Sequence, residues 1–516
     1  MGCFFMPKTT EFAGWKDGIH MIVFMIAYVA VLIGIALYSS RRVSSGEDFL
    51  LAGRRMGPWM TAFAYGTSYF SAVVFIGYAG QFGWGFGASA TWIGIGNAVV
   101  GSLLAWLVLG RRTRSMTQRL DAKTMPEFLE SRYQSPKLKL VAAVVVFAFL
   151  LPYSASVFQG ISYLFETLIG LPFIWCVVGI VVLTGVYLVA GGYLATALTD
   201  FFQGIIMLVG IVLVVVFVLK SPQVGGLQAG LDKLAAVDPN LTHPWGGAGQ
   251  LWPLASLVIL TSLGVWGLPQ MTHKFYAIRD KAAIRQGTII SSVFALIVSG
   301  GCYFVGVFAR LFNGDPTQLP VDPATGLGNT SLLVPQMLLS SLPPLLLGLV
   351  MVLVLSASMS TLSSLILVSS SAVCVDLIPS SVKAKISQRR NKGLMQLICI
   401  VFLILSFLLA INKSNTITQL MNLSWGTLAG AFLGPYLAGL YMKRATRAGA
   451  WAGFLGGLAV SLVCNLIVPR FVPGFTSAMA GTFAMGASIL LTVAVSFFTP
   501  SLDQTHINRV MDFSQE

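Results

Sequence analysis

The sequence predicts an all-α polytopic membrane protein, and both its composition and its pattern of hydropathy indicate this class. Of its 516 residues, 56% are hydrophobic and only 10% are charged, and the mean hydropathy is +0.82. Soluble domains carry about 25% charged residues, so this composition excludes an ordinary soluble protein. A membrane-spanning helix needs about 20 apolar residues. About 13 stretches meet this need, at residues 18–38, 57–80, 87–109, 137–167, 172–190, 195–219, 250–271, 286–312, 331–377, 393–411, 416–441, 446–468 and 474–498.

The basic residues indicate how these spans are oriented. If the chain starts outside and crosses the membrane 13 times, the cytoplasmic loops hold 24 of the 32 Lys and Arg residues and the outer loops hold seven. Because cytoplasmic loops carry an excess of Lys and Arg, we expect the N-terminus outside and the C-terminus inside. The net charge of +14 then orients the chain against the lipid bilayer and does not indicate binding of nucleic acid.

The span at 57–80 is the first with an irregular interior. Residues Tyr65–Ser71 place a glycine and three Ser or Thr residues at mid-depth. Interrupted helices are typical of transporters, in which unwound carbonyls bind ions and helix ends face the substrate. A second interruption, at Pro269, follows four further spans and removes a backbone donor. This spacing predicts two inverted repeats of five helices, each starting with a broken helix. The expected parts of one transmembrane domain (1–499) are an additional helix at 18–38, repeats at 57–219 and 250–441, and two C-terminal helices at 446–498, before a cytoplasmic tail at 500–516.

Asp200 is an acid inside an apolar stretch, because it is followed directly by the apolar run 201–219. An ionisable residue within the membrane marks a functional site by default, since its burial is costly. The alternative is that Asp200 only caps the start of a helix, where the helix dipole favours negative charge.

The long apolar stretch at 331–377 contains a run of hydroxyl residues, Ser356–Ser364, and no charge between 330 and 375. Pro343 and Pro344 are expected to separate a loop-side helix from the span itself. Neutral oxygens on one helix face suit a weakly held hard cation such as Na⁺. Close packing of two membrane helices is the alternative, because it also favours small and hydroxyl residues. The face is formed by Ala357, Ser360, Thr361 and Ser364, with Ser363 beside it.

Three motifs of the chain resemble those of a known family. They are the segment from Glu47 to Pro58, the segment from Gly191 to Asp200 with Gln203, and the segment from Ser358 to Ser363. In these the chain resembles the sodium/solute symporters, which include bacterial sodium/proline, sodium/pantothenate and sodium/sialic acid carriers and the sodium/glucose cotransporters. The resemblance implies the inverted five-plus-five fold of LeuT type, alternating access, and a multi-pass location in the bacterial inner or plasma membrane.

The resemblance also implies where Na⁺ binds. One ion is expected at the carbonyls of Thr67, Phe70 and Ala357 and the hydroxyls of Ser360 and Thr361. The sialic acid carrier resembles this chain at a second sodium site as well. The binding of a second Na⁺ ion is therefore a hypothesis. Its site would share Ser360 with the first site and would add Asp200, Ser363 and Ser364.

The solute is less closely defined by the resemblance. The region from Gly264 to Gln286 resembles the pantothenate carrier, so pantothenate or a related monocarboxylate is expected first. Proline or another small amino acid is expected second. The first-helix region resembles the proline carrier, but the position of that carrier's acid in the first break is occupied here by Tyr69. No Lys or Arg is expected deep in a span, so a solute carboxylate would bind to hydroxyls, helix ends or the ion. The candidate wall of the solute pocket is Ser68, Tyr69, Ser71, Gln81, Phe82, Gln159, Trp266 and Gln270.

Other functions are expected to fit less well. A sodium-coupled sugar or sialic acid symporter is the alternative within the class, and a sodium channel or leak and a transport-like sensor are alternatives outside it. An enzyme is not expected, because no span holds paired carboxylates, a His cluster or a nucleophile and base at helical spacing. The chain is expected to work as a monomer.

Overall fold

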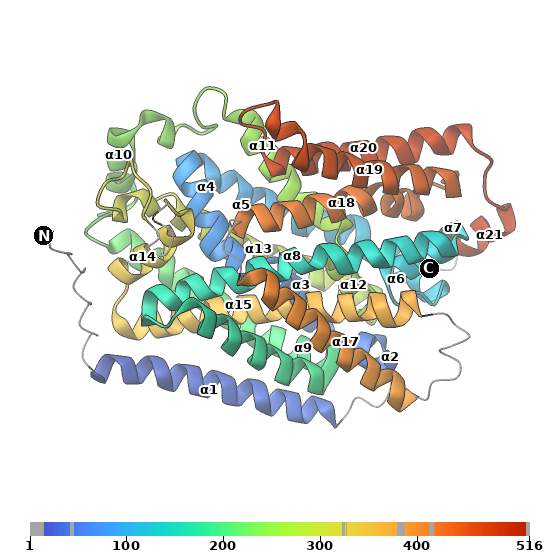
Figure 1. The fold of residues 1–516 in the computed structure, drawn as a ribbon, viewed down its shortest axis with the longest axis horizontal. Helices are drawn as coiled ribbons and strands as arrows, with labels where there is room; N and C mark the ends of the chain where they lie inside the picture. Colours follow the sequence, from blue (N-terminus) through green and yellow to red (C-terminus); the bar gives the residue numbers. More distant parts are fainter. Residues whose placement is uncertain are drawn as a thin grey trace, which may run out of the picture.

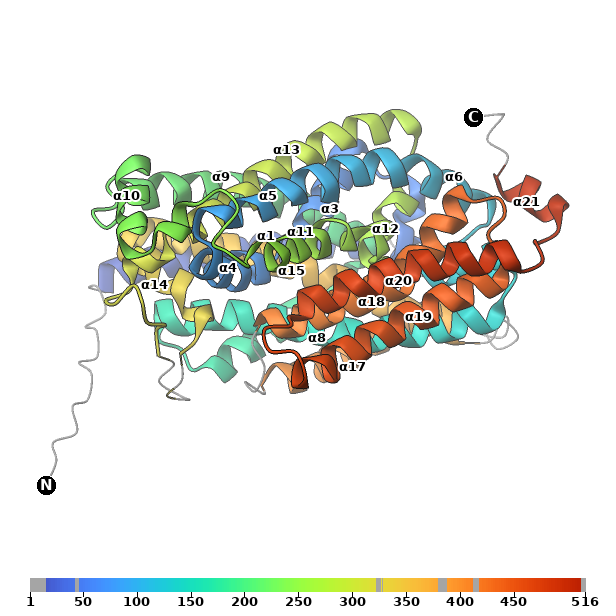
Figure 2. The ribbon, with the colours of Figure 1, turned by 90° about the horizontal axis from the view of Figure 1, so that it is seen from above.

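The protein is an elongated bundle of long helices that run side by side (Figures 1 and 2). The computed structural model describes residues 15–41, 46–321, 326, 328–378, 388–411 and 417–511, and their regular structure is helical apart from two isolated β-bridges. The α-helices are α1 (Trp15–Ser40), α2 (Gly46–Leu51), α3 (Pro58–Tyr69), α4 (Ala79–Phe86), α5 (Thr91–Ala98), α6 (Arg111–Arg119), α7 (Met125–Tyr133), α8 (Pro136–Ile169), α9 (Phe173–Lys220), α10 (Leu227–Val237), α11 (Leu251–Ser262), α12 (Pro269–Ala277), α13 (Lys281–Gly306), α14 (Leu333–Ser341), α15 (Pro344–Ser371), α17 (Gln388–Ala410), α18 (Ile417–Tyr441), α19 (Arg447–Leu466), α20 (Ser477–Phe498) and α21 (Gln504–Met511).

Short turns of other helix types connect several of these elements. The π-helical turns are Val73–Tyr78, Val99–Leu104, Trp106–Gly110 and Ala372–Leu377. The 3-10 turns are Ala52–Arg54, Gly87–Ala90, Pro239–Thr242, Gly264–Gly267, Ala309–Phe312, Thr330–Leu332 and Val468–Arg470.

Judged by length and apolar composition, fewer helices can cross a membrane than the 13 spans predicted from the sequence. In the described part of the chain nine helices are long and apolar enough to cross a membrane, or ten if Leu251–Gly267 and Pro269–Ala277, bent by 46°, form one span. One difference arises in α9, which bends at Gly192 (φ 56): the part matching the predicted span 195–219 is long enough to cross, whereas the part matching 172–190 is a shorter apolar helix, Phe173–Val186. Glycine has no Cβ and adopts this backbone conformation without strain. The predicted loop-side helix before Pro343 is confirmed as α14, and the predicted tail contains α21, while residues 512–516 lie outside the described part.

Helix α15 lies at the centre of the bundle. It packs against α1, α3, α8 and α9, and every residue from Val350 to Ser371 is buried. A helix with no charged residue on any side is typical of a core, and this position brings its hydroxyl face against α3. Around this centre the outward faces carry large apolar residues, including Trp175, Leu490 and Phe498, as expected where helices contact lipid.

The three helices α18, α19 and α20 form a tightly packed group along one side (Figure 2). Their contact depends on glycine: a Cβ atom on Gly457 of α19 would lie 1.8 Å from the carbonyl oxygen of Gly430 in α18. The two backbones can therefore approach this closely only while position 457 lacks a side chain, as is common for membrane helices.

Replacing Gly457 with alanine is expected to force α18 and α19 apart and to lower stability by about 1–3 kcal/mol, the usual cost of overpacking. The measurement is the thermal-denaturation midpoint of the purified protein. Gly486→Ala in α20 is the matched control, because a Cβ there meets nothing within 4 Å. Equal midpoints for the two variants would contradict the close contact.

Candidate ion and solute site

The first break predicted from the sequence is present at the end of α3. The helix ends at Tyr69, and Phe70 takes an extended backbone with φ −111 and ψ 103. The backbone N–H of Phe70 still donates to the carbonyl of Gly66, at 3.2 Å, but the helix does not continue beyond it. The last carbonyls of a helix have no partner within the helix and carry the negative end of its dipole. The break therefore leaves carbonyl oxygens in the middle of the bundle, where they favour a cation.

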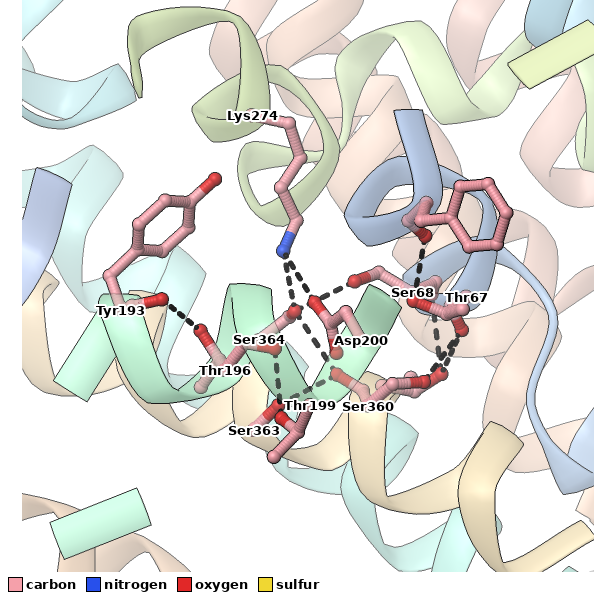
Figure 3. A network of polar contacts seen from close by, with 12 residues as sticks. Thr67, Ser68, Tyr193, Thr196, Thr199, Asp200, Lys274, Ser360, Ser363 and Ser364 are labelled. Atoms are coloured by element: carbon pink, nitrogen blue, oxygen red, sulfur yellow. Dashed lines mark hydrogen bonds and ion pairs between the residues drawn. The ribbon is translucent and has the colours of Figure 1, made fainter. Parts of the chain in front are cut away.

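The hydroxyls of Ser360 and Thr361 in α15 face these carbonyls, and Figure 3 shows Ser360 beside Thr67. The Ser360 hydroxyl lies 2.9 Å from the Thr67 carbonyl and 3.0 Å from the Ala357 carbonyl. The Thr361 hydroxyl lies 3.3 Å from the carbonyls of Thr67 and Ser68 and 3.1 Å from that of Ala357. Each hydroxyl has one hydrogen, so these two side chains can donate to only two of the three carbonyls at a time. These five neutral oxygens, all buried, form a ligand set suited to a hard monovalent cation.

Most of the first predicted ion site is brought together by this arrangement. Thr67, Ala357, Ser360 and Thr361 converge as predicted, and the carbonyl of Ser68, which sequence reasoning assigned to the solute wall, joins them. Phe70 is buried at the break, but no hydrogen bond of the described residues joins its carbonyl to α15.

Lys274 corrects the expectation that no Lys or Arg lies deep in a span. The predicted span ends at residue 271, which placed Lys274 in a cytoplasmic loop. In the structure α12 continues to Ala277, and Lys274 is 1% exposed. Pro269 could have given the signal, because proline is favoured at the first position of a helix and so predicts that a new helix starts there. A second signal was Asp200, because a buried carboxylate is costly without a positively charged partner nearby.

The Lys274 ammonium lies among the residues of the second predicted ion site (Figure 3). Its nitrogen is 3.7 Å from Oδ2 of Asp200 and 2.9 Å from the Ser364 hydroxyl. Asp200 is fully buried, and neither of its oxygens has a hydrogen-bond partner among the described residues. The Ser363 hydroxyl donates to the Ser360 carbonyl at 2.9 Å. The predicted second set is therefore present as a cluster, but it already contains a positive charge.

The two sets are joined through shared residues. The hydroxyls of Ser364 and Ser68 lie 2.8 Å apart, and the Ser364 hydroxyl is also 3.1 Å from the Ser360 carbonyl. Ser68 thus contributes its carbonyl to the first set and its hydroxyl to the second. One hydrogen bond between the Ser68 and Ser364 hydroxyls therefore connects the two sets.

The residues predicted to line the solute pocket fall into separate groups. Gln81 and Phe82 line a cavity of about 730 Å³ at the end of the bundle near α4, where the Thr418 hydroxyl donates to Gln81 at 2.5 Å. Gln159 instead donates to the Ala410 carbonyl at 3.2 Å. Gln270 is buried, and neither polar atom of its amide has a hydrogen-bond partner among the described residues. Such a group is unusual in a folded protein and is available to a ligand.

Of the remaining predicted residues, Tyr69 and Ser71 lie at the first break and Trp266 lies at the second. The Tyr69 hydroxyl donates to the Thr261 carbonyl at 2.5 Å, and Ser71 accepts from the Val73 amide at 3.2 Å. Trp266 donates to the Val100 carbonyl at 3.0 Å.

An aromatic cluster that the sequence did not reveal covers the break. The Tyr69 ring stacks on Phe70 with centroids 4.3 Å apart and lies 5.9 Å from Trp425, which meets Tyr153 edge-on at 5.8 Å. Trp425 and Tyr153 come from α18 and α8, so only the tertiary fold places them here.

Comparison with known protein sequences identifies a matching family and several relatives. The model of the sodium:solute symporter family matches residues 49–457. The osmoregulated proline transporter OpuE of Bacillus subtilis is 29% identical over 474 residues, 89% of this chain and 93% of that protein. A sodium/proline symporter of Staphylococcus aureus is 28% identical over 526 residues, covering 98% and 97% of the two chains.

Solved structures show the fold. A Na⁺-coupled sialic acid symporter in a substrate-bound outward-open state superimposes with a TM-score of 0.78 at 18% identity, over 95% of this chain and all of that one. Mhp1, a nucleobase-cation-symport-1 family transporter, gives 0.53 at 14% identity, over 90% and 97%. These likenesses confirm the predicted all-helical fold of LeuT type.

Proposed function

We propose, since the chain belongs to the sodium:solute symporter family, that it takes up a small amino acid, proline first, together with Na⁺ bound between α3 and α15. The protein is a multi-pass membrane protein and a Na⁺–solute symporter, and no enzymatic activity is assigned to it. The observation that carries the proposal is the set of five neutral oxygens at the end of α3.

The order of solutes expected from the sequence changes in favour of proline. The named solute of the curated relatives given above is proline, and they match this chain over about nine-tenths of its length or more. Pantothenate, which the sequence placed first, has no support among them. The cavity beside Gln81 and Phe82 offers an entry path for a small polar solute, and the aromatic cluster at the break offers an apolar surface for its ring.

The proposed coupling follows from where the ion ligands come from. The carbonyls of Thr67 and Ser68 belong to α3 of the first predicted repeat, while the Ala357 carbonyl and both hydroxyls belong to α15 of the second, so a bound ion would hold the two repeats together. Neutral ligands bind Na⁺ with modest affinity, which lets the ion leave on the side where Na⁺ is low. Each positive charge that crosses the potential supplies about 2.3 kcal/mol per 100 mV. The basic helix α6 lies at the opposite end of the bundle from α4 (Figure 1), which supports an outer position for the cavity.

Purified protein in liposomes is expected to accumulate proline when Na⁺ is supplied outside and the interior is negative, and not when K⁺ replaces Na⁺. Uptake should saturate with proline and collapse when the Na⁺ gradient is dissipated. Pantothenate and sialic acid, added in excess, should not compete. Entry of Na⁺ that is independent of any solute would instead identify a leak, and accumulation of proline in K⁺ alone would refute the coupling.

A further inference from the structure

We propose that the ammonium of Lys274 takes the place of a second Na⁺ ion, so that the cluster at Asp200, Ser363 and Ser364 holds a cation of the chain itself. The protein then binds one Na⁺ ion, at the α3–α15 set. The proposal deepens the function proposed above, but the number of bound ions can be measured without any solute.

The ammonium lies where a second ion would have to bind. Its nitrogen is 2.9 Å from the Ser364 hydroxyl and 3.7 Å from a carboxylate oxygen of Asp200, and it lies 5.3 Å from the centroid of the Tyr193 ring. Lysine offers three N–H donors and no acceptor, so it seeks the same hydroxyl and carboxylate oxygens as a hard cation. Its stem comes from α12, on the far side of the second break, and reaches across to α9 and α15 (Figure 3).

The charges within the cluster balance without an added ion. Asp200 supplies one negative charge and Lys274 one positive charge, and both side chains are buried. Among the described residues, the other buried acid of the membrane region, Asp376, pairs with Lys139 at 3.8 Å instead. A Na⁺ ion at Asp200 would therefore be a second positive charge beside a single carboxylate, in a medium of low dielectric constant where repulsion is strong. The first set carries no formal charge and is free of this conflict.

The same geometry predicts what removal of the ammonium would do. Without it, Asp200 is a buried carboxylate that has lost its counter-charge, next to the hydroxyls of Ser363 and Ser364 and close to the Ser360 carbonyl. That set, one acid with neutral oxygens, is what a Na⁺ site requires. Lys274→Ala is thus expected to create a second Na⁺ site, whereas Lys274→Arg keeps the charge and is not.

The test is equilibrium binding of ²²Na⁺ to the full-length protein purified without solute, with the number of ions bound per chain as the readout. Wild type and Lys274→Arg are expected to bind one ion, and Lys274→Ala two. The double variant with Asp200→Asn should return to one, because the new site needs the carboxylate. Lys220→Ala, at the exposed end of the same helix as Asp200, is the matched control and should bind one ion.

Two results would overturn the proposal. One is a wild type that binds two ions and loses one on Asp200→Asn, because the cluster would then hold Na⁺ beside Lys274. The other is a folded Lys274→Ala protein that binds no more Na⁺ than wild type. If Lys274→Ala does not fold, the wild-type count decides, since one ion supports the proposal and two ions contradict it. A wild type that binds no Na⁺ refutes the proposed function, while the gain of one ion on Lys274→Ala still tests this inference separately.

Discussion

Replacing Ser360 and Thr361 together with alanine is expected to abolish Na⁺-driven uptake. The double variant removes two of the five oxygens that converge at the end of α3, and both of the hydroxyls. The loss of a partner by a buried polar group costs about 1–3 kcal/mol. For two ligands, about 3 kcal/mol corresponds to a loss of Na⁺ affinity of about a hundred-fold. Half-saturation would then exceed the Na⁺ concentrations at which transport operates.

The measurement is proline uptake in liposomes as a function of external Na⁺, together with the Na⁺-dependent shift of the denaturation midpoint. Ser358→Ala is the control on the same helix, because the Ser358 hydroxyl donates at 2.7 Å to the Val354 carbonyl within α15. Thr361→Ser keeps an oxygen and should retain much of the affinity. An unchanged Na⁺ dependence in the double variant would show that the hydroxyl face only packs against α3, the alternative that the sequence left open.

Much of the architecture could be predicted because local sequence encodes it. Runs of apolar residues define most spanning helices, and Gly66 and Pro269 indicate both breaks in the sequence itself. The hydroxyl run predicted a candidate ion site because Ser360, Thr361 and Ser364 share one helix face, a property of helical periodicity alone. What could not be predicted depends on contacts between distant segments.

The solute pocket and Lys274 show this limit. Gln159, predicted to face the pocket, donates to the Ala410 carbonyl, a contact between distant segments that no local pattern specifies. Trp425 reaches the break only because α18 packs beside α8. Lys274 was assigned to a loop because a basic residue ordinarily ends a span, while its partner, Asp200, lies 74 positions earlier in the chain. A buried ion pair makes both residues compatible with the membrane, but neither residue alone reveals the other.

Neutralising one member of the Asp200–Lys274 pair is expected to destabilise the protein far more than neutralising both. Each single variant, Asp200→Asn or Lys274→Met, leaves an unpaired charge in the bundle, at a cost of about 3–5 kcal/mol. The double variant buries no charge and should recover most of that loss, which gives a coupling of about 3 kcal/mol between the two sites.

Denaturation midpoints of the four proteins, taken in K⁺ medium free of Na⁺, measure this coupling, because no added Na⁺ can then replace the missing ammonium. Na⁺ should raise the midpoint of Lys274→Met more than that of wild type, since the freed carboxylate binds the ion, and it should not do so for Asp200→Asn, in which the unpaired charge is positive. This asymmetry separates an electrostatic pair from two independent packing defects, which would destabilise additively and respond equally to Na⁺. Additive losses would mean that the 3.7 Å contact does not hold α12 against α9.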